Sequence, residues 1–204
     1  SIYKGNALIA ILDYGSGNLR SALRAFETTG KRTYLTSDPD IAVKADALVV
    51  PGVGAFGACM KGLLKVNGDQ VIKERFKSGK ATLGICVGMQ VLFEAGLEHG
   101  EYAGVGVAKG KVEKLEAPVL PHMGWNTVRI EGESALFKGI ERESFYFVHS
   151  YAVKERLDTP SAYTNYFGEF LAAFENGPIS ATQFHPEKSS AAGLKLINNW
   201  VNSL

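Results

Sequence analysis

Residues 82–90 read TLGICVGMQ, an apolar segment that runs into Cys86 and has a glycine two places before that cysteine and another two places after it. This pattern is typical of a buried strand that turns sharply into a helix. Only very small neighbours leave room for such a turn, which pushes the central side chain out of the sheet. The stretch predicts an α/β fold with Cys86 at the carboxyl end of a strand, where ligands bind in such sheets.

The first half of the chain alternates strand-like and helix-like segments. Apolar runs that are typical of buried strands occupy residues 7–12, 47–52 and 81–86. Amphipathic stripes predict helices from residue 19 to the stop at Gly30, over residues 70–79, and after Cys86 as far as about Gly96. Strands that are apolar throughout indicate a mostly parallel central sheet flanked by helices.

The second half of the chain has a different pattern of residue types. From about Gly104, β-branched and aromatic runs separated by turn residues predict antiparallel strands that extend the sheet or form a second small one. A closing helix is expected from about Ser189. Because no repeat or linker interrupts the chain, residues 1–204 are predicted to be a single domain. Residues 1–6 lack any period, and we expect an irregular arm or an artificial remnant there.

Composition limits the partners and the compartment. The 22 basic and 21 acidic residues leave a net charge of +1, which argues against nucleic acid or an anionic membrane as the partner. The longest apolar run, residues 7–12, is far below the roughly 20 residues of a membrane span. Two cysteines, Cys59 and Cys86, form no disulfide framework, and we find no signal-peptide pattern. The sequence therefore predicts a cytoplasmic protein with reduced thiols.

Two motifs predict a nucleophile with its base. Amides at the start of the helix after Cys86 would favour the thiolate, and a thiolate nucleophile needs an oriented base. In TQFHPEKSS, residues 182–190, the proline favours extended geometry at His185, so two residues of extended chain can bring His185 and Glu187 to one face. The alternatives are a cysteine that serves packing and a surface histidine beside a turn.

A glycine-rich loop is the third motif. PGVGAFG, residues 51–57, follows a predicted strand and can present backbone N–H groups to an oxyanion. A simple turn between strand and helix is the alternative. A phosphate loop of Walker type is excluded because the GK[ST] ending is missing, and GSGNLR, residues 15–20, lacks the final glycine of a dinucleotide fingerprint.

Together these motifs resemble the class I glutamine amidotransferases, in which a cysteine elbow and a later HPE supply a Cys–His–Glu triad. Within that family, DYGSGN, PGVGAFG, GICVGMQVLFE, PHMGWN, FYFVHSY and QFHPEKS are similar to glutaminase subunits of imidazole glycerol phosphate synthases, and they span about residues 13–189. The resemblance implies that Cys86, His185 and Glu187 hydrolyse L-glutamine to glutamate and ammonia through a cysteine thioester. It implies no cofactor and no metal. Glutamine and the oxyanion would be held by Gly52, Val53, Gly54 and Gln90.

The resemblance also implies a partner. Ammonia would pass to a (β/α)8-barrel cyclase subunit, forming a heterodimer that makes imidazole glycerol phosphate and aminoimidazole carboxamide ribotide in histidine biosynthesis. The residues expected at the interface are Asn18, Met123, Trp125, Asn126, Tyr146 and Lys188, although a tryptophan beside glycine is also typical of a core. His149 is expected near the active site or its partner-facing edge. The alternatives are a glutaminase subunit of an anthranilate, aminodeoxychorismate or guanylate synthase, and a different cysteine hydrolase or binding subunit.

Overall fold

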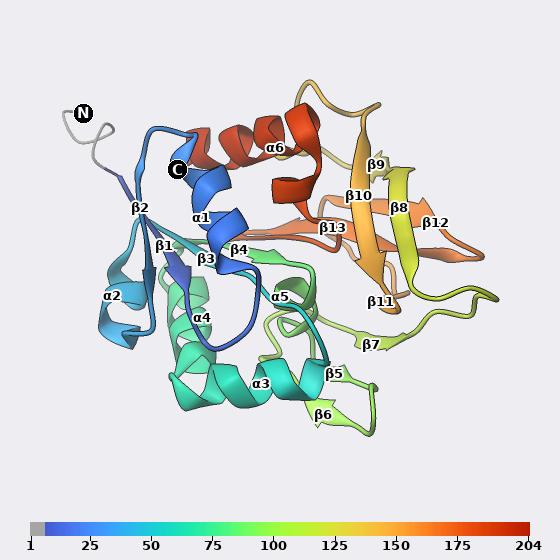
Figure 1. Cartoon of the computed structure of the whole chain (residues 1–204), viewed down its shortest axis with the longest axis horizontal. Helices are drawn as coiled ribbons and strands as arrows, with labels where there is room; N and C mark the ends of the chain where they lie inside the picture. Colours follow the sequence, from blue (N-terminus) through green and yellow to red (C-terminus); the bar gives the residue numbers. More distant parts are fainter. Residues whose placement is uncertain (1–6) are drawn as a thin grey trace.

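A mixed eight-stranded sheet forms the centre of the molecule (Figure 1). The computed structural model describes residues 7–204, so the arm expected at residues 1–6 lies outside the described residues. Five parallel strands come first in the sheet order: β2 (Arg32–Thr36), β1 (Leu8–Leu12), β3 (Ala47–Val50), β4 (Ala81–Ile85) and β14 (Ile179–Thr182). The sheet continues with three antiparallel strands: β13 (Glu169–Asn176), β12 (Ser161–Asn165) and β9 (Arg129–Glu131). The predicted α/β class with a mostly parallel sheet is confirmed.

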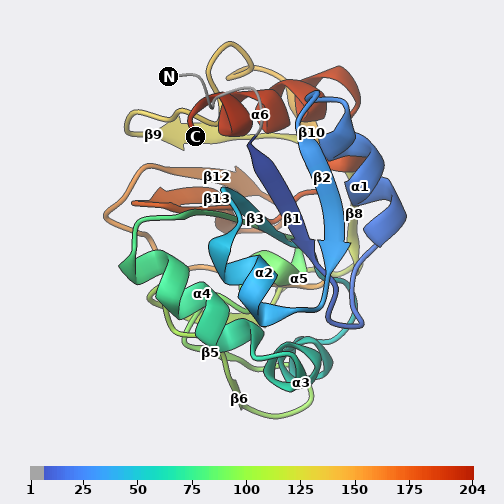
Figure 2. The same ribbon diagram turned by 90° about the vertical axis from the view of Figure 1, so that its left-hand side faces the viewer.

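Helices cover both faces of the parallel part (Figures 1 and 2). One face carries α1 (Leu19–Glu27) and α6 (Ser190–Asn202), and the other carries α2 (Pro39–Lys44), α3 (Phe56–Lys65) and α4 (Gly68–Lys77). Phe26 of α1 packs edge-on against Trp200 of α6, with ring centroids 5.9 Å apart. Every residue of β3 is buried, and the side chains of Leu48, Val49 and Val50 each contribute about 1.5–3 kcal/mol by leaving water. The helices at 19–30 and 70–79 were predicted, whereas β2, α2 and α3 were not.

A buried arginine ties α2 and α4 to the sheet. Arg75 of α4 donates hydrogen bonds to the carbonyl oxygens of Ala42, Val43 and Ala45, at the end of α2, and to that of Ala81. It also donates to Thr82 Oγ1 at 3.2 Å. The last carbonyls of a helix have no partner within the helix, and here the guanidinium supplies one. Burial lowers the pKa of Arg75 to about 10, so the group stays charged at neutral pH.

The remaining strands form two small sheets beside the carboxyl ends of the parallel strands. β8 (His122–Thr127) pairs antiparallel with β10 (Ser144–His149), and this pair, which we call the β8–β10 ribbon, lies at the end of the molecule away from α2 (Figure 1). The other sheet contains β11 (Tyr151–Val153), β7 (Lys111–Lys114), β5 (Ala95–Gly96) and β6 (Tyr102–Ala103). The second half therefore both extends the main sheet and builds separate sheets. Within residues 7–204, no helix has the length and apolar character needed to cross a bilayer.

The helix predicted from Cys86 to about Gly96 is wrong in length. α5 (Val87–Gln90) has four residues, and strand β5 already begins at Ala95. The carbonyls of Val91, Leu92 and Phe93 accept hydrogen bonds from the amides of Val105, Ala108 and Gly106. A second segment of chain thus takes the carbonyls that would otherwise continue the helix. The apolar residues at 91–93 are buried, but they lie outside any helix.

Candidate active site

The cysteine elbow combines a strained residue with glycines that make room for it. Cys86 directly follows β4 and has φ 58° and ψ −117°, a conformation that costs an L-residue about 1–3 kcal/mol. A Cβ on Gly88 would lie 1.9 Å from the carbonyl oxygen of Val50, and one on Gly84 would lie 2.5 Å from the oxygen of Gly88. The glycines therefore allow three stretches of backbone to touch, while the positive φ is carried by Cys86 itself.

The expected helix dipole at the thiol is not available in this structure. α5 is too short to align many peptide dipoles, and its first amide, that of Val87, donates to Gly52 O at 3.2 Å. That amide follows the nucleophile directly, which is the position that supplies an oxyanion donor in related elbows. The Val87 amide is therefore not free to donate to the Cys86 sulfur in this structure.

His185 and Glu187 form the most direct side-chain pair of the site. His185 Nδ1 lies 2.5 Å from Glu187 Oε1, and both side chains are almost completely buried. His185 is extended, as predicted, but Glu187 lies in a 3-10 turn, η2 (Pro186–Lys188), so the expectation of an extended dipeptide is wrong for its second half. The turn that begins at Pro186 ends the extended run and brings the Glu187 carboxylate to Nδ1 of the His185 ring. His185 and Glu187 therefore meet through a 3-10 turn and not through an extended dipeptide.

The ring nitrogen opposite Glu187 faces the cysteine. His185 Nε2 has no hydrogen-bond partner among residues 7–204, and His185 and Cys86 line the same cavity. Burial alone would lower the pKa of His185, but the neighbouring Cys86 and Glu187 side chains outweigh it and raise that pKa to about 10. The arrangement places a protonated imidazolium beside Cys86 at the cavity, and a neighbouring cation is one of the features that activate a cysteine nucleophile.

A cavity of about 390 Å³ opens over these groups. Its volume falls within the usual range for small-molecule sites. Of the residues predicted to act on glutamine, Val53, Gly54 and Gln90 line it, and Gly52 is buried next to that wall. Lys188, predicted at the interface, lies at the cavity as well. The structure therefore brings the three predicted motifs to one place.

The glycine loop is held by side chains that the sequence did not single out. The Val53 N–H donates to Ser16 Oγ at 3.1 Å, and the Val53 carbonyl lies 2.9 Å from the same oxygen. The Cys59 thiol donates to that carbonyl at 3.2 Å, and Tyr14 donates its hydroxyl to Pro51 O. Burial raises the pKa of both Tyr14 and Cys59, which keeps them protonated donors. We call Ser16 and Cys59 the loop latch, because together they bind the backbone N–H and the backbone carbonyl of Val53.

Two buried histidines lie beside the cavity. His149 contributes to its wall, and its Nδ1 lies 3.0 Å from Tyr151 O. Its Nε2 lies 2.9 Å from His122 Nδ1. Burial lowers the pKa of both rings, that of His149 to about 3, so both are neutral at pH 7. His122 is also buried and belongs to this pair.

The predicted interface residues occupy exposed or half-exposed positions. Met123 and Trp125 of β8 are 62% and 54% exposed, so the alternative that Trp125 is a core residue is wrong. Its ring lies edge-on to Tyr146 of β10, with centroids 6.0 Å apart. Asn126 is half-buried on β8, and Asn18 accepts a hydrogen bond from Ser21 N at the start of α1. The β8–β10 ribbon therefore presents an exposed face with large apolar side chains.

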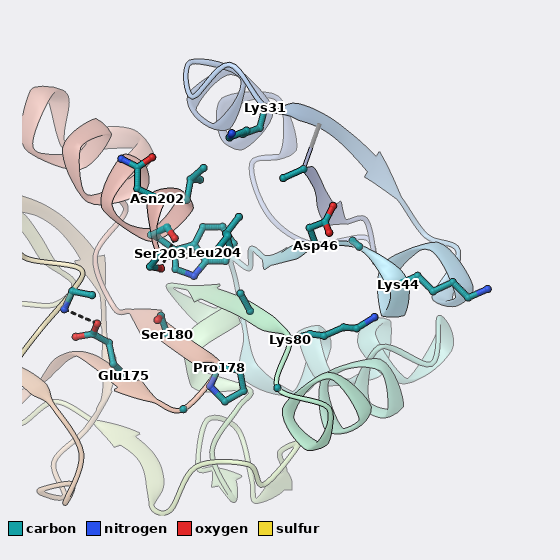
Figure 3. A pocket seen from close by; sticks show the side chains of 18 residues that line it. Lys31, Lys44, Asp46, Lys80, Glu175, Pro178, Ser180, Asn202, Ser203 and Leu204 are labelled. Carbon is teal, nitrogen blue, oxygen red and sulfur yellow. Dashed lines mark hydrogen bonds between the residues drawn. The ribbon is translucent and has the colours of Figure 1, made fainter. Parts of the chain in front are cut away.

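A larger cavity, of about 710 Å³, lies at the other end of the sheet (Figure 3). It is lined at the amino ends of the strands, by residues that include Lys80, Asp46 and Glu175, and no cysteine or histidine of the described chain lines it. Asp46 accepts a hydrogen bond from Leu8 N, and Glu175 accepts one from Ala135 N. These carboxylates hold main chain in place. No group of three His, Cys, Asp or Glu side chains within residues 7–204 is arranged to hold a metal ion.

Comparison with known proteins places this chain in a family. Residues 10–203 match the model of the glutamine amidotransferase class-I family. The chain is 54% identical over 206 residues to the imidazole glycerol phosphate synthase subunit HisH of Nocardia farcinica, with 96% of this chain and 98% of that relative covered. The corresponding subunit of Mycolicibacterium paratuberculosis is 52% identical over 201 residues, with the same coverage.

Solved structures share the fold at much lower identity. A crystal structure of a glutamine amidotransferase superposes with a TM-score of 0.75 at 17% identity, covering 95% of this chain and 98% of that one. PurLQS from Thermotoga maritima superposes with a TM-score of 0.74 at 18% identity, covering 97% of this chain and 99% of that chain. At such identities the likeness concerns the fold alone.

Proposed function

The chain belongs to the class I glutamine amidotransferase family, and from this membership we propose that it is the glutaminase subunit of an imidazole glycerol phosphate synthase. The observation that carries the proposal is a cavity lined by Cys86 and His185, with the buried Glu187 carboxylate paired to the far nitrogen of His185. Relatives with more than half of their residues identical carry the name of this subunit, which supports the choice within the family. Residues 1–204 would act as one domain, in the cytoplasm.

In the proposed reaction, the Cys86 thiolate attacks the side-chain amide carbon of L-glutamine and forms a tetrahedral intermediate. The carbon–nitrogen bond then breaks, His185 gives its proton to the departing amine, and ammonia leaves a thioester on Cys86. Water attacks the thioester, His185 takes a proton from that water, and the carbon–sulfur bond breaks to release glutamate. Glu187 holds Nδ1 of His185, so that Nε2 faces the reacting atoms throughout.

Binding of glutamine would use the loop at Gly52–Gly54 together with Gln90. Both Nε2 hydrogens of Gln90 point at protein acceptors, the Tyr151 carbonyl at 3.0 Å and Gln183 Oε1 at 3.1 Å, so toward a substrate Gln90 offers its oxygen. The oxyanion would be met by the Val53 N–H. Because Ser16 occupies that N–H in this structure, the peptide must turn before it can serve, and we propose that the chain by itself is a slow glutaminase.

The proposed partner is a (β/α)8-barrel cyclase subunit that receives the ammonia. Its product would be imidazole glycerol phosphate, with aminoimidazole carboxamide ribotide released in the same step. Exposed Met123 and Trp125 on the β8–β10 ribbon support a contact surface there, since large apolar side chains grouped on a surface are typical of interaction sites. Asn18, Asn126, Tyr146 and Lys188 would complete that contact.

Glutamate release by the purified chain, with and without the ligand-loaded barrel subunit, tests this function. We expect very slow turnover alone and an increase of orders of magnitude with the barrel. Cys86→Ala is expected to abolish turnover and stoichiometric labelling by a glutamine-mimicking electrophile. Stimulation by a chorismate-using enzyme instead would assign the chain to another synthase. Labelling away from Cys86 would contradict glutaminase function, and unchanged turnover in His185→Ala would contradict the assignment of the base.

A further inference from the structure

Gln183 is a buried polar residue beside the nucleophile that the proposed reaction has not used. It follows β14 directly, it is fully buried, and its Nε2 lies 3.8 Å from Cys86 Sγ. Its other end, Oε1, lies 3.1 Å from Gln90 Nε2. A primary amide can turn either its N–H or its oxygen toward a neighbour. Only the N–H end stabilises negative charge on sulfur, so the orientation of this amide matters for Cys86.

The main-chain carbonyl of Tyr151 decides that orientation. A carbonyl oxygen only accepts hydrogen bonds, so the atom of Gln90 that lies 3.0 Å from it must be the amide nitrogen. The second hydrogen of the same nitrogen then points at Gln183, which must present its oxygen on that side. The nitrogen of Gln183 is left to face Cys86. Each amide in this series thus has one orientation that satisfies all of its hydrogen bonds.

The two neutral histidines continue the series toward the surface. His149 Nδ1 also meets the Tyr151 carbonyl, at 3.0 Å, so it carries the proton, and Nε2 of the neutral ring accepts. His122 Nδ1 must then donate to it across 2.9 Å, which leaves His122 Nε2 to accept from Asn126 Nδ2 at 3.5 Å. Hydrogen bonds therefore run in one direction from Asn126, on the β8–β10 ribbon, to the carbonyl that orients Gln90.

We propose that Gln183 is a positioning residue that directs an amide N–H at the Cys86 thiolate, and that the Tyr151 carbonyl fixes its direction through Gln90. The effect on Cys86 follows from the geometry alone, whereas its consequence for turnover rests on the proposed glutaminase function. The titratable and charged groups around Cys86 are His185 with Glu187, His149, Tyr14, Cys59, and the Glu98 and Lys188 side chains that line the same cavity. Substitution of Gln183 leaves all of them in the chain, so a change in the behaviour of Cys86 reports the amide.

The test is the pH dependence of alkylation in the full chain. Iodoacetamide reacts with thiolate, and mass spectrometry of the Cys86 peptide between pH 5 and pH 10 separates that cysteine from buried Cys59. We expect Gln183→Met, which keeps the length but lacks the donor, to raise the pH midpoint of alkylation by about one unit. Gln183→Glu should raise it further, because a carboxylate repels the thiolate. Gln70→Met, on the exposed side of α4, is the matched control and should leave the midpoint unchanged.

Midpoints of both Gln183 variants within about 0.2 unit of the wild-type value would overturn the proposal. If Gln183→Met does not fold, as judged by circular dichroism, Gln90→Met replaces it. That change frees the Gln183 amide to rotate and is expected to raise the midpoint by a smaller amount, while an unchanged midpoint again counts against the proposal. Turnover with the barrel subunit is measured separately. A raised alkylation midpoint in the Gln183 variants, with no glutamine turnover by the wild-type complex, would support the role of Gln183 and contradict the glutaminase function. Glutamine turnover by the wild-type complex, with an unchanged midpoint in the variants, would support the glutaminase function and contradict the role of Gln183.

Discussion

Removal of the Ser16 hydroxyl should raise the glutaminase rate of the chain by itself. In Ser16→Ala the Val53 N–H loses its acceptor at 3.1 Å, while the Cys59 thiol still holds the Val53 carbonyl. One neutral hydrogen bond contributes about 0.5–1.5 kcal/mol, so the orientation with a free N–H becomes more populated by a factor of about 2 to 12. If turnover by the chain alone is limited by that population, its rate rises by the same factor.

The assay is glutamate release with and without the ligand-loaded barrel partner. The turnover rate of Ser16→Ala with the partner should equal that of the wild type, because the Val53 N–H is expected to be free already in the complex. The ratio of the rate with the partner to the rate without it should therefore fall by the factor of about 2 to 12. Ser78→Ala is a matched control: its hydroxyl donates to Glu74 O on the exposed end of α4, far from the loop. A Ser16→Ala chain that folds normally but is no faster than wild type would refute the idea that the loop latch restrains the site.

Three further predictions concern stability. Burial lowers the pKa of His149 to about 3, so between pH 6.5 and pH 3 only the unfolded chain binds a proton at this ring, and the free energy of unfolding falls by about 2 kcal/mol on going from neutral pH to pH 5. In urea unfolding, His149→Gln should therefore show a flatter pH dependence of stability than the wild type. His99→Gln, which changes an exposed ring, is the control and should keep the wild-type pH dependence. Arg75→Met leaves several buried carbonyls unpaired and should cost about 3–5 kcal/mol, seen as a lower Tm by about 6–20 °C; an unchanged Tm would contradict the capping role. Gly88→Ala places a Cβ 1.9 Å from the Val50 carbonyl oxygen and should prevent folding. Gly54→Ala, at a position with φ 85° and open space around it, should lower the free energy of unfolding by only about 1–2 kcal/mol. Equal yields of folded protein from the two variants would contradict this reasoning.

Features that depend on neighbouring residues were the ones that the sequence predicted well. The strand before Cys86, the proline after His185 and the glycines of the loop each fix local backbone, and the structure brings the three motifs together around one cavity. The length of α5 was missed because its end is decided by residues 104–108, which bind the carbonyls of residues 91–93. Local periodicity contains no information about such a competitor.

The contacts that control the site were also outside the reach of sequence reasoning. Ser16 and Gln183 both lie within quoted motifs, DYGSGN and QFHPEKS, yet their functions depend on partners 37 and 97 positions away. A hydroxyl in a turn satisfies its own backbone in most proteins, so nothing local distinguishes Ser16. The direction of the Gln183 amide requires knowledge of a main-chain carbonyl in a different strand.

The positive φ of Cys86 affects the choice of inactive variants. The strain belongs to the backbone, so Cys86→Ala and Cys86→Ser keep it, and such variants measure the stability of the native chain faithfully. Cys86→Gly removes both the sulfur and the strain, and the gain from relaxing the backbone partly hides any loss from the missing side chain. Glycine at position 86 would therefore give a more stable protein that lacks its nucleophile, so at this one position stability and reactivity oppose each other.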